Sequence, residues 1–243
     1  MVKVVHQNWA TIPVLSIIHG FDVWACATSP VAAEHRMTSH DRCTLFSIGC
    51  APQLKVFPPN QAVPQAIFMS SYSVRPATAR DAKAIADIHV ATWKATYSEL
   101  MPENFLKAMT AEMRLAYWKE AIEYSEPQTL VAVAAGDNQV VGFVGFDRSR
   151  DPGTRSTVGE VWALYVMPEH ARQGAGIALW DGARDGLKEE GCTQVTAWVL
   201  LNNAPAMAFF EHSAGFKREM PSLRTTAFGT ARLEEIRLKR AVD

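Results

Sequence analysis

The sequence predicts an α/β fold in which helices lie on both faces of a mixed β-sheet. Strand-like and helix-like segments alternate in the second half of the chain, which is typical of parallel strands joined by helices. Before them, two strand-like segments are joined by the turn-forming residues 135–138, and such a hairpin adds antiparallel pairing. Both kinds of pairing are therefore expected in one sheet.

The composition excludes several classes of protein. The chain has 243 residues and a formal net charge of −1, which gives no support for binding to nucleic acid or to a membrane surface. No apolar run approaches the roughly 20 residues that span a bilayer. The apolar residues 12–18 faintly resemble the core of a signal peptide, but Asp22 closes them off. None of the four cysteines forms a Cys-x-x-Cys pair, so we expect no metal site, no disulfide framework and a cytoplasmic location.

The chain divides into two unequal parts near residue 69. Residues 1–68 carry few charges and show neither a sustained helical period nor strand alternation. We interpret them as a poorly ordered N-terminal extension, either a real one or the product of an over-extended gene start with the true start at Met69. The regular signals that follow predict one domain over residues 70–243.

The elements of this domain can be read in order. Residues 72–75 form a short strand, and residues 78–81 (Thr-Ala-Arg-Asp) resemble a capping box that opens a helix to about Tyr97. Pro102 opens a second helical stretch, which residues 111–124 continue. Further strands are expected at residues 129–134, 140–147, 158–166, 194–200, 216–219 and 233–238, and further helices at residues 174–190 and 203–212.

The residues between the strand at 158–166 and the helix at 174–190 form a candidate phosphate-binding loop. The strand stops before Pro168, and a short basic loop with Gly174 and Gly176 leads into the helix, whose N-terminus favours anions. A dinucleotide-binding Rossmann motif would need a third glycine where Leu179 stands, and a P-loop would need Gly-Lys-Ser/Thr. An acetyl-coenzyme A pyrophosphate loop remains.

Here the chain resembles the GNAT superfamily of N-acetyltransferases. Its central motif is matched by Val166-Met-Pro168 and by the run from Ala171 to Gly176, although Ala171 replaces the usual Arg or Gln. A second block, residues 203–216, resembles the family's Asn-x-x-Ala-x-x-Phe-Tyr-Glu-x-x-Gly-Phe helix with one extra residue before Gly215. Residues 88–97 resemble the first helix of many members. The resemblance covers about residues 72–240 and implies a mostly antiparallel sheet with one splayed parallel pair, at residues 158–166 and 194–200.

The resemblance also implies how acetyl-CoA would bind. The pyrophosphate would lie on the loop, and Asn203 would bind the pantetheine arm, although Asn is also a good helix N-cap. Phe210 would pack against that arm or in the core. The implied donor-binding residues are Tyr165, Val166, Arg172, Gln173, Gly174, Ala175, Gly176, Ile177, Ala178, Asn203 and Phe210.

Acetyl transfer to an amine needs a base and an oxyanion donor. Glu160 is the candidate base, through a water, because several relatives carry a catalytic Glu at this strand position; the alternative is a strand glutamate at a solvated edge or in an ion pair. The resemblance places the oxyanion donor in the backbone N–H near Val166, where family members bulge the strand. Phe210 stands where relatives often have a tyrosine that protonates the thiolate, so that general acid is missing.

His89, Trp93 and Tyr97 recur at i, i+4 and i+8 and share one helix face. They are candidates for the acceptor pocket, with core packing as the alternative. We therefore predict an N-acetyltransferase, a monomer or homodimer, that acts on a small-molecule or peptide amine by direct attack. The alternatives are an inactive acyl-CoA-binding regulatory module and a dinucleotide-binding oxidoreductase, which lacks its third glycine.

Overall fold

The computed structural model describes residues 71–242 of the chain. The predicted N-terminal extension, the Met69 start, the signal-like residues 12–18 and three of the four cysteines lie outside the described residues.

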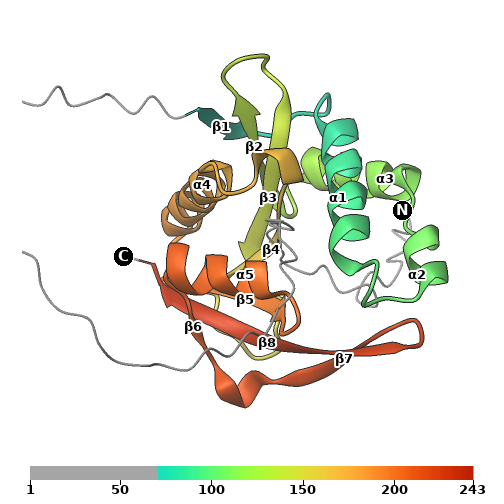
Figure 1. Cartoon of the computed structure of the whole chain (residues 1–243). Helices are drawn as coiled ribbons and strands as arrows, with labels where there is room; N and C mark the ends of the chain where they lie inside the picture. The colour runs from blue at the N-terminus through green and yellow to red at the C-terminus, as the bar shows by residue number, and fades with distance from the viewer. Residues whose placement is uncertain (1–70, 243) are drawn as a thin grey trace, which may run out of the picture. The chain divides into compact units, whose positions relative to one another are not determined.

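Eight strands and several helices alternate along the described chain (Figure 1). In chain order they are β1 (Tyr72–Pro76), α1 (Ala82–Tyr97), α2 (Glu103–Ala108), α3 (Ala111–Tyr124), β2 (Gln128–Ala134), β3 (Val140–Arg148), β4 (Val158–Val166), η2 (Pro168–His170), α4 (Ala175–Glu189), β5 (Gln194–Leu200), α5 (Ala204–Ala208), η3 (Phe209–Ser213), β6 (Lys217–Arg218), η4 (Met220–Ser222), β7 (Arg224–Phe228) and β8 (Ala231–Ala241).

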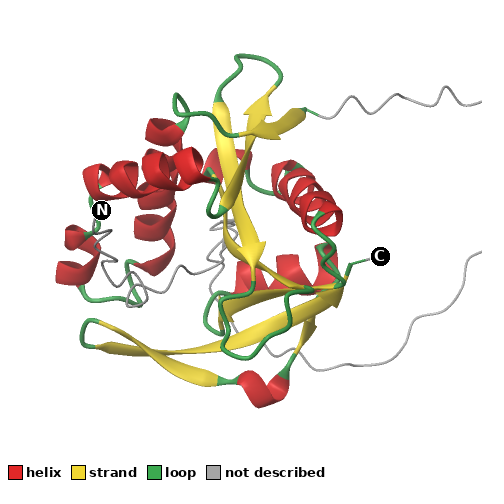
Figure 2. Cartoon of the chain, turned by 180° about the vertical axis from the view of Figure 1, so that it is seen from behind, coloured by secondary structure: helices red, strands yellow, loops and turns green. Residues whose placement is uncertain are grey.

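All eight strands belong to one mixed sheet. Its order is β1-β2-β3-β4-β5-β8-β6, and β7 pairs with β8 outside that path. Every described strand pair is antiparallel except β4 with β5. Helices α1–α3 lie on one side of the sheet and α4 on the other (Figures 1 and 2). The predicted mixed sheet with helices on both faces is confirmed.

The parallel pair β4–β5 separates part-way along its length. The strands pair from Val158 opposite Gln194 to Val161 opposite Ala197. Beyond that point β4 pairs only with β3, as far as Val166, while β5 pairs only with β8, as far as Leu200. The splay that the family resemblance implies is therefore present in the strand pairing.

Helix α4 packs closely on the sheet because glycines lie on both sides of the contact. A Cβ added at Gly182 would come within 2.9 Å of Leu130, and one at Gly186 within 2.9 Å of Phe146. On the sheet side of the same contact, a Cβ added at Gly159 of β4 would come within 2.6 Å of Leu187 in α4. Contacts this close leave no room for side chains, so the glycines fix the depth at which α4 lies on the sheet.

The ends of two helices differ from the expected pattern. At the start of α1 the capping box is half formed: the Asp81 carboxylate accepts from the Thr78 N–H at 2.7 Å, but the Thr78 hydroxyl donates to Asp81 as well. The predicted helix 203–212 is the short α5 followed by a π-turn in which the Ala214 N–H donates to the Phe209 carbonyl. A π-turn contains one more residue than an α-turn, so it absorbs the extra residue before Gly215.

Strand β7 was not predicted. It pairs with β8 from Arg224 opposite Glu235 to Phe228 opposite Ala231 and forms a hairpin with Gly229 at φ 60° in the turn. The predicted strands at residues 216–219 and 233–238 correspond to the two-residue β6 and to the longer β8.

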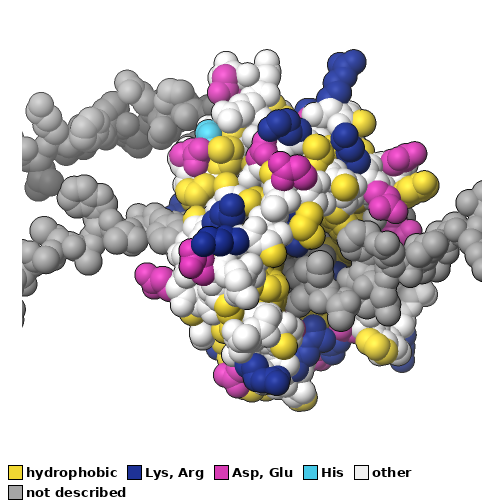
Figure 3. All heavy atoms as spheres, turned by 90° about the vertical axis from the view of Figure 1, so that its right-hand side faces the viewer, with side chains coloured by type: hydrophobic (Ala, Val, Ile, Leu, Met, Phe, Trp, Pro, Cys, Tyr) yellow, Lys and Arg dark blue, Asp and Glu magenta, His cyan; other side chains and the backbone are white. Residues whose placement is uncertain are grey.

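Among the described residues, no helix is long and apolar enough to cross a membrane. Basic and acidic side chains are interspersed on the face seen in Figure 3, without a broad patch of one sign among the described residues.

Candidate functional site

The loop between β4 and α4 presents a helix N-terminus without a side-chain cap. Arg172 and Gly174 both have left-handed backbone, at φ 60° and φ 98°, and α4 begins directly after Gly174. No side chain caps this end, and the Ala178 N–H is the first to donate to the Gly174 carbonyl. The N–H groups of the first turn therefore have no partner within the helix, and together with the dipole they can bind an anion such as a phosphate.

The side chain of Gln173 fastens this loop to the edge of the sheet. Its Oε1 accepts from the Tyr72 hydroxyl at 3.1 Å, and its Nε2 donates to the Glu169 carbonyl at 2.7 Å. The same Tyr72 hydroxyl lies 3.2 Å from Nδ1 of His170. The Gln173 side chain can therefore hold the loop in position, and its backbone N–H takes no part in these contacts.

The π-turn η3, which follows α5, contacts the start of α4 through Phe209. A Cβ added at Gly176 would lie 3.3 Å from Cε2 of Phe209, so the two helices meet closely there. Phe210 points elsewhere: it is fully buried, and its ring lies 5.0 Å from that of Phe216. Of the two placements expected for Phe210, the core is the one observed.

The backbone of Val166 faces the gap between the splayed strands. The Met167 N–H donates to the Val141 carbonyl at 2.8 Å, which makes Val166 and Gly142 a non-hydrogen-bonded pair. The Val166 N–H therefore points away from β3 and toward the side from which β5 has diverged. The bulge of β4 lies earlier than expected, at Trp162, where Gly145 pairs with Ala163 and Phe146 with Val161.

Asn203 joins the end of β5 to α1. Its Oδ1 accepts from the Ala206 N–H at 3.0 Å, so it is the predicted N-cap of α5. Its Nδ2 donates to the Tyr97 hydroxyl at 3.1 Å, and both residues are buried. The Asn203 amide is therefore fixed in orientation at the open end of the splay.

Glu160 lies in a buried ion pair. Its side chain is 1% exposed, and it accepts hydrogen bonds from the Arg150 N–H at 2.9 Å, from Nε at 3.2 Å and from Nη2 of the same residue. These three donors occupy most of the roughly four acceptor positions of a carboxylate. The contacts favour the ion-pair interpretation, and a role as the base stays a prediction.

The three aromatic residues of α1 are packed in the core. His89, Trp93 and Tyr97 share one helix face as predicted, and each is at most 1% exposed. His89 stacks on Tyr165 with 4.8 Å between ring centroids, and its Nδ1 accepts from Nε1 of Trp118 at 3.1 Å. Nε1 of Trp93 donates to the Tyr165 hydroxyl at 2.7 Å. The contacts favour packing, so contact with the acceptor stays a prediction for these residues.

Burial also sets the protonation of these groups. It holds the pKa of His89 well below its ordinary value, with Arg114 adding to the effect, and it raises the pKa of the Tyr97 and Tyr165 hydroxyls. The Tyr165 side chain lies on the α1 side of the sheet, stacked on His89, and its backbone pairs with Phe143 of β3, so its contact with a donor stays a prediction. Cys192 is buried, which raises the pKa of its thiol, and Nη1 of Arg148 lies 2.9 Å from the sulfur.

Sequence reasoning missed several charged residues on the α1 side of the sheet. Arg150 pairs with Glu160, Glu235 of β8 is buried and pairs with Arg224 at 2.7 Å, and Arg114 of α3 is buried. The paired residues are ten and eleven positions apart and are brought together by the sheet, while Arg114 makes no ion pair, so no local sequence pattern predicts these roles. Only Glu235 carries a signal, as an acid two residues after Leu233, on the same face of a predicted strand.

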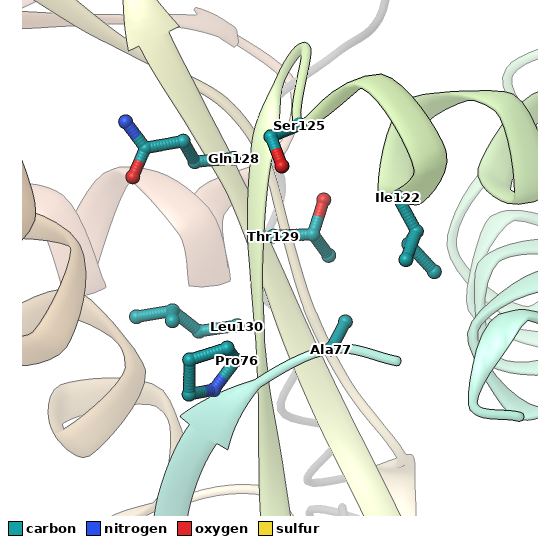
Figure 4. Close-up of a pocket in the computed structure, with 7 residues that line it drawn as sticks. All are labelled: Pro76, Ala77, Ile122, Ser125, Gln128, Thr129 and Leu130. Atoms are coloured by element: carbon teal, nitrogen blue, oxygen red, sulfur yellow. The ribbon is translucent and has the colours of Figure 1, made fainter. Parts of the chain in front are cut away.

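One hollow in the surface does not belong to this site. A hollow of about 130 Å³ is lined by Pro76, Ala77, Ile122, Ser125, Gln128, Thr129 and Leu130 (Figure 4). Gln128 hydrogen-bonds to Glu190, so the hollow lies at the end of α4 opposite Gly174. Among residues 71–242, no group of three His, Cys, Asp or Glu side chains could hold a metal ion.

Comparisons with known proteins agree with this geometry. Residues 90–216 match the model of the acetyltransferase (GNAT) family. The chain is 31% identical over 144 residues to the uncharacterized N-acetyltransferase YuaI of Bacillus subtilis, which covers 57% of this chain and 77% of that protein. It is 23% identical over 155 residues to the spermidine N(1)-acetyltransferase of Thermoplasma acidophilum, which covers 61% of this chain and 90% of that protein.

Solved structures show the same fold. The acetyltransferase yncA of Salmonella typhimurium, solved with its cofactor acetyl-CoA, matches with a TM-score of 0.55 at 22% identity, over 72% of this chain and 95% of that one. An N-acetyltransferase of Staphylococcus aureus matches with a TM-score of 0.58 at 18% identity, over 72% and 100% of the two chains. Because the family model matches more than half of the sequence, this chain belongs to the GNAT family and is an N-acetyltransferase rather than an inactive acyl-CoA-binding module.

Proposed function

We propose that this enzyme transfers an acetyl group from acetyl-CoA to a small-molecule or peptide amine by direct attack, without an acyl-enzyme. The observation that carries the proposal is the uncapped N-terminus of α4 beside the gap between β4 and β5. A helix N-terminus suits a pyrophosphate, and an open strand edge suits an extended chain with amide groups. Coenzyme A combines both groups in one molecule.

The residues present fit this donor. The backbone of Arg172–Ala178 would hold the pyrophosphate, because two left-handed residues and the first turn of α4 gather N–H groups there. The backbone of Val166 and the amide of Asn203 would hold the pantetheine arm, since they border the splay. No metal is needed for this chemistry. We also propose a cytoplasmic location, because the spacing of the four cysteines does not suggest a disulfide framework.

Bound acetyl-CoA supplies an activated thioester carbonyl. The Val166 N–H, which faces away from β3, would hydrogen-bond to the carbonyl oxygen, where negative charge develops as the amine attacks. Glu160 would accept the proton that the amine loses, through a water, at the lone-pair position that Arg150 leaves open. The new C–N bond then replaces the C–S bond. Phe210 has no proton for the departing thiolate, so solvent supplies it.

Thiol release measured with acetyl-CoA and a panel of amines tests the proposal. We expect the full chain to release coenzyme A only with an amine present. Gly174→Ala should raise the donor KM about 5- to 30-fold, because an L-residue in left-handed backbone costs roughly 1–2 kcal/mol. Gly136→Ala is the matched control, since nothing lies within 4 Å of a Cβ at either glycine and only Gly174 has positive φ. Tight acetyl-CoA binding with no thiol release for any amine would overturn the proposal.

Two further variants separate the roles of Glu160. If it is the base, Glu160→Gln should lower kcat by about 10²-fold or more and leave the donor KM unchanged. Arg150→Met removes the same ion pair but keeps the carboxylate, so it should retain more activity than Glu160→Gln at equal loss of stability. Equal activity in the two variants would assign Glu160 to structure alone.

A further inference from the structure

Arg114 of α3 is a buried guanidinium without a partner. The residue is 9% exposed, and within residues 71–242 its guanidinium makes no hydrogen bond and no ion pair; its Nε is completely buried. The buried carboxylates of Asp81, Glu160 and Glu235 are each paired with an arginine. Arg114 is therefore the exception among the buried charges that the structure describes.

The groups around Arg114 are neutral. Burial and Arg114 itself hold the pKa of His89 well below its ordinary value, so the imidazole is uncharged at pH 7. Burial raises the pKa of Tyr117 and Tyr165, so both keep their protons. An arginine stays charged even where burial lowers its pKa. No neighbour among these compensates the charge, and an uncompensated buried charge is unfavourable unless a ligand supplies the counter-ion.

The position of Arg114 excludes the donor's phosphates as that counter-ion. Trp118, one turn further along α3, packs on Phe143 at 4.7 Å between ring centroids, on the side of the sheet that α1 covers. Helix α4 and its phosphate loop lie on the opposite side (Figure 1). Tyr165 lies near Arg114 and directly precedes Val166, whose N–H faces the splay. The guanidinium thus belongs to the side from which an acceptor reaches the thioester.

We propose that Arg114 binds a carboxylate of the acceptor, so that the enzyme prefers amines that carry a carboxylate, such as free amino acids, to neutral amines and polyamines. A guanidinium presents two parallel N–H donors that match the two oxygens of a carboxylate. The inference rests on the proposed function, because only an acetyl acceptor needs to bind on this side. It makes Arg114 a determinant of acceptor specificity.

The test compares each amino acid with its own carboxamide as acceptor, with spermidine as the polycation. For the wild-type enzyme we expect kcat/KM at least about tenfold higher for the carboxylate. Arg114→Met should raise the acceptor KM for the carboxylate and leave the carboxamide and the donor KM unchanged. Arg114→Lys should restore the preference only in part, because it keeps the charge and loses the fork. Arg184→Met is the matched control, since that arginine lies on α4 and is paired with Asp181 and Asp185.

A second readout does not depend on turnover. The amino acid, but not its carboxamide, should raise the midpoint of thermal unfolding of the wild-type protein and have no effect on Arg114→Met. Arg114→Met alone should not lower that midpoint, because it removes an unpaired buried charge. Equal use of carboxylate and carboxamide, or an unchanged preference in Arg114→Met, would overturn the inference and leave the proposed function intact. Absence of thiol release with every amine would instead count against the proposed function.

Discussion

At the scale of single residues, the absence of a side chain at Gly176 allows α4 to pack closely against η3. A Cβ at Gly176 would lie 3.3 Å from the Phe209 ring, which is tighter than ordinary packing. Gly176→Val should therefore push Phe209 away and weaken coenzyme A binding about tenfold, since overpacking costs roughly 1–3 kcal/mol. Isothermal titration with coenzyme A measures the change.

The companion variant Phe209→Leu tests whether that contact is the cause. It shortens the facing side chain, so the double variant Gly176→Val, Phe209→Leu should bind more tightly than Gly176→Val alone. If the two changes add without coupling, the loss of affinity comes from the backbone of Gly176 and not from the contact.

Residues whose role depends on local backbone were predictable from sequence. Gly174 stands where the chain needs positive φ, and Asn203 stands where a helix begins, so both could be assigned from their neighbours alone. Glu160 could not, because its partner Arg150 is brought to it by the fold. The same holds for Arg114, since the absence of a partner is a property of the folded surroundings.

At the scale of elements, Asp81 fixes the start of α1. Its carboxylate accepts from Arg75 and from Thr78, and these hydrogen bonds lower the pKa of Asp81 from 3.8 to about 2. Because the folded pKa lies below the unfolded value, the contribution to stability is complete above pH 4 and is lost as the pH falls from about 4 to about 2. Its size is about 1–2 kcal/mol, reduced because Arg75 is half-exposed.

Urea unfolding of the wild-type protein and of Asp81→Asn measures this contribution. The difference in unfolding free energy between the two should be constant from pH 7 to about 5 and should shrink toward pH 3. Lys83→Met is the control, because its exposed pair with Asp87 should contribute less than about 0.5 kcal/mol. A difference that grows as the pH falls would contradict the assignment.

The elements with strong periodicity were predicted almost to the residue, and β7 was missed. Strand β4 and helix α4 have long runs of buried positions that packing confirms. β7 reads Arg-Thr-Thr-Ala-Phe, and only Phe228 at its end is buried, so it has no apolar alternation to detect. The β-branched Thr225 and Thr226 before Gly229 were the available signal for a hairpin.

At the scale of the whole molecule, the β7–β8 hairpin ties the last strands to the first helices. Phe228 is fully buried at its tip, 6.0 Å from the Phe105 ring of α2 and 6.4 Å from the Trp93 ring of α1. These contacts join segments more than a hundred residues apart in sequence, on the side of the sheet that carries Arg114. The hairpin can therefore affect the side of the sheet on which we propose that the acceptor binds, while α4 and the loop before it lie on the other side (Figure 1).

Truncating the Phe228 ring should distinguish an effect on acceptor binding from an effect on donor binding. Phe228→Ala should destabilise the protein by about 3–5 kcal/mol and lower its unfolding midpoint by roughly 6–20 °C, because a buried aromatic side chain leaves a cavity. At a temperature where the variant remains folded, the acceptor KM should rise while the donor KM stays unchanged, since the contacts lie on the α1 side of the sheet. Phe228→Leu should show the same pattern more weakly, and Tyr124→Ala, a 69% exposed aromatic, should change neither quantity. A donor KM that rises in parallel with the acceptor KM would mean that the hairpin supports the whole sheet rather than the acceptor side.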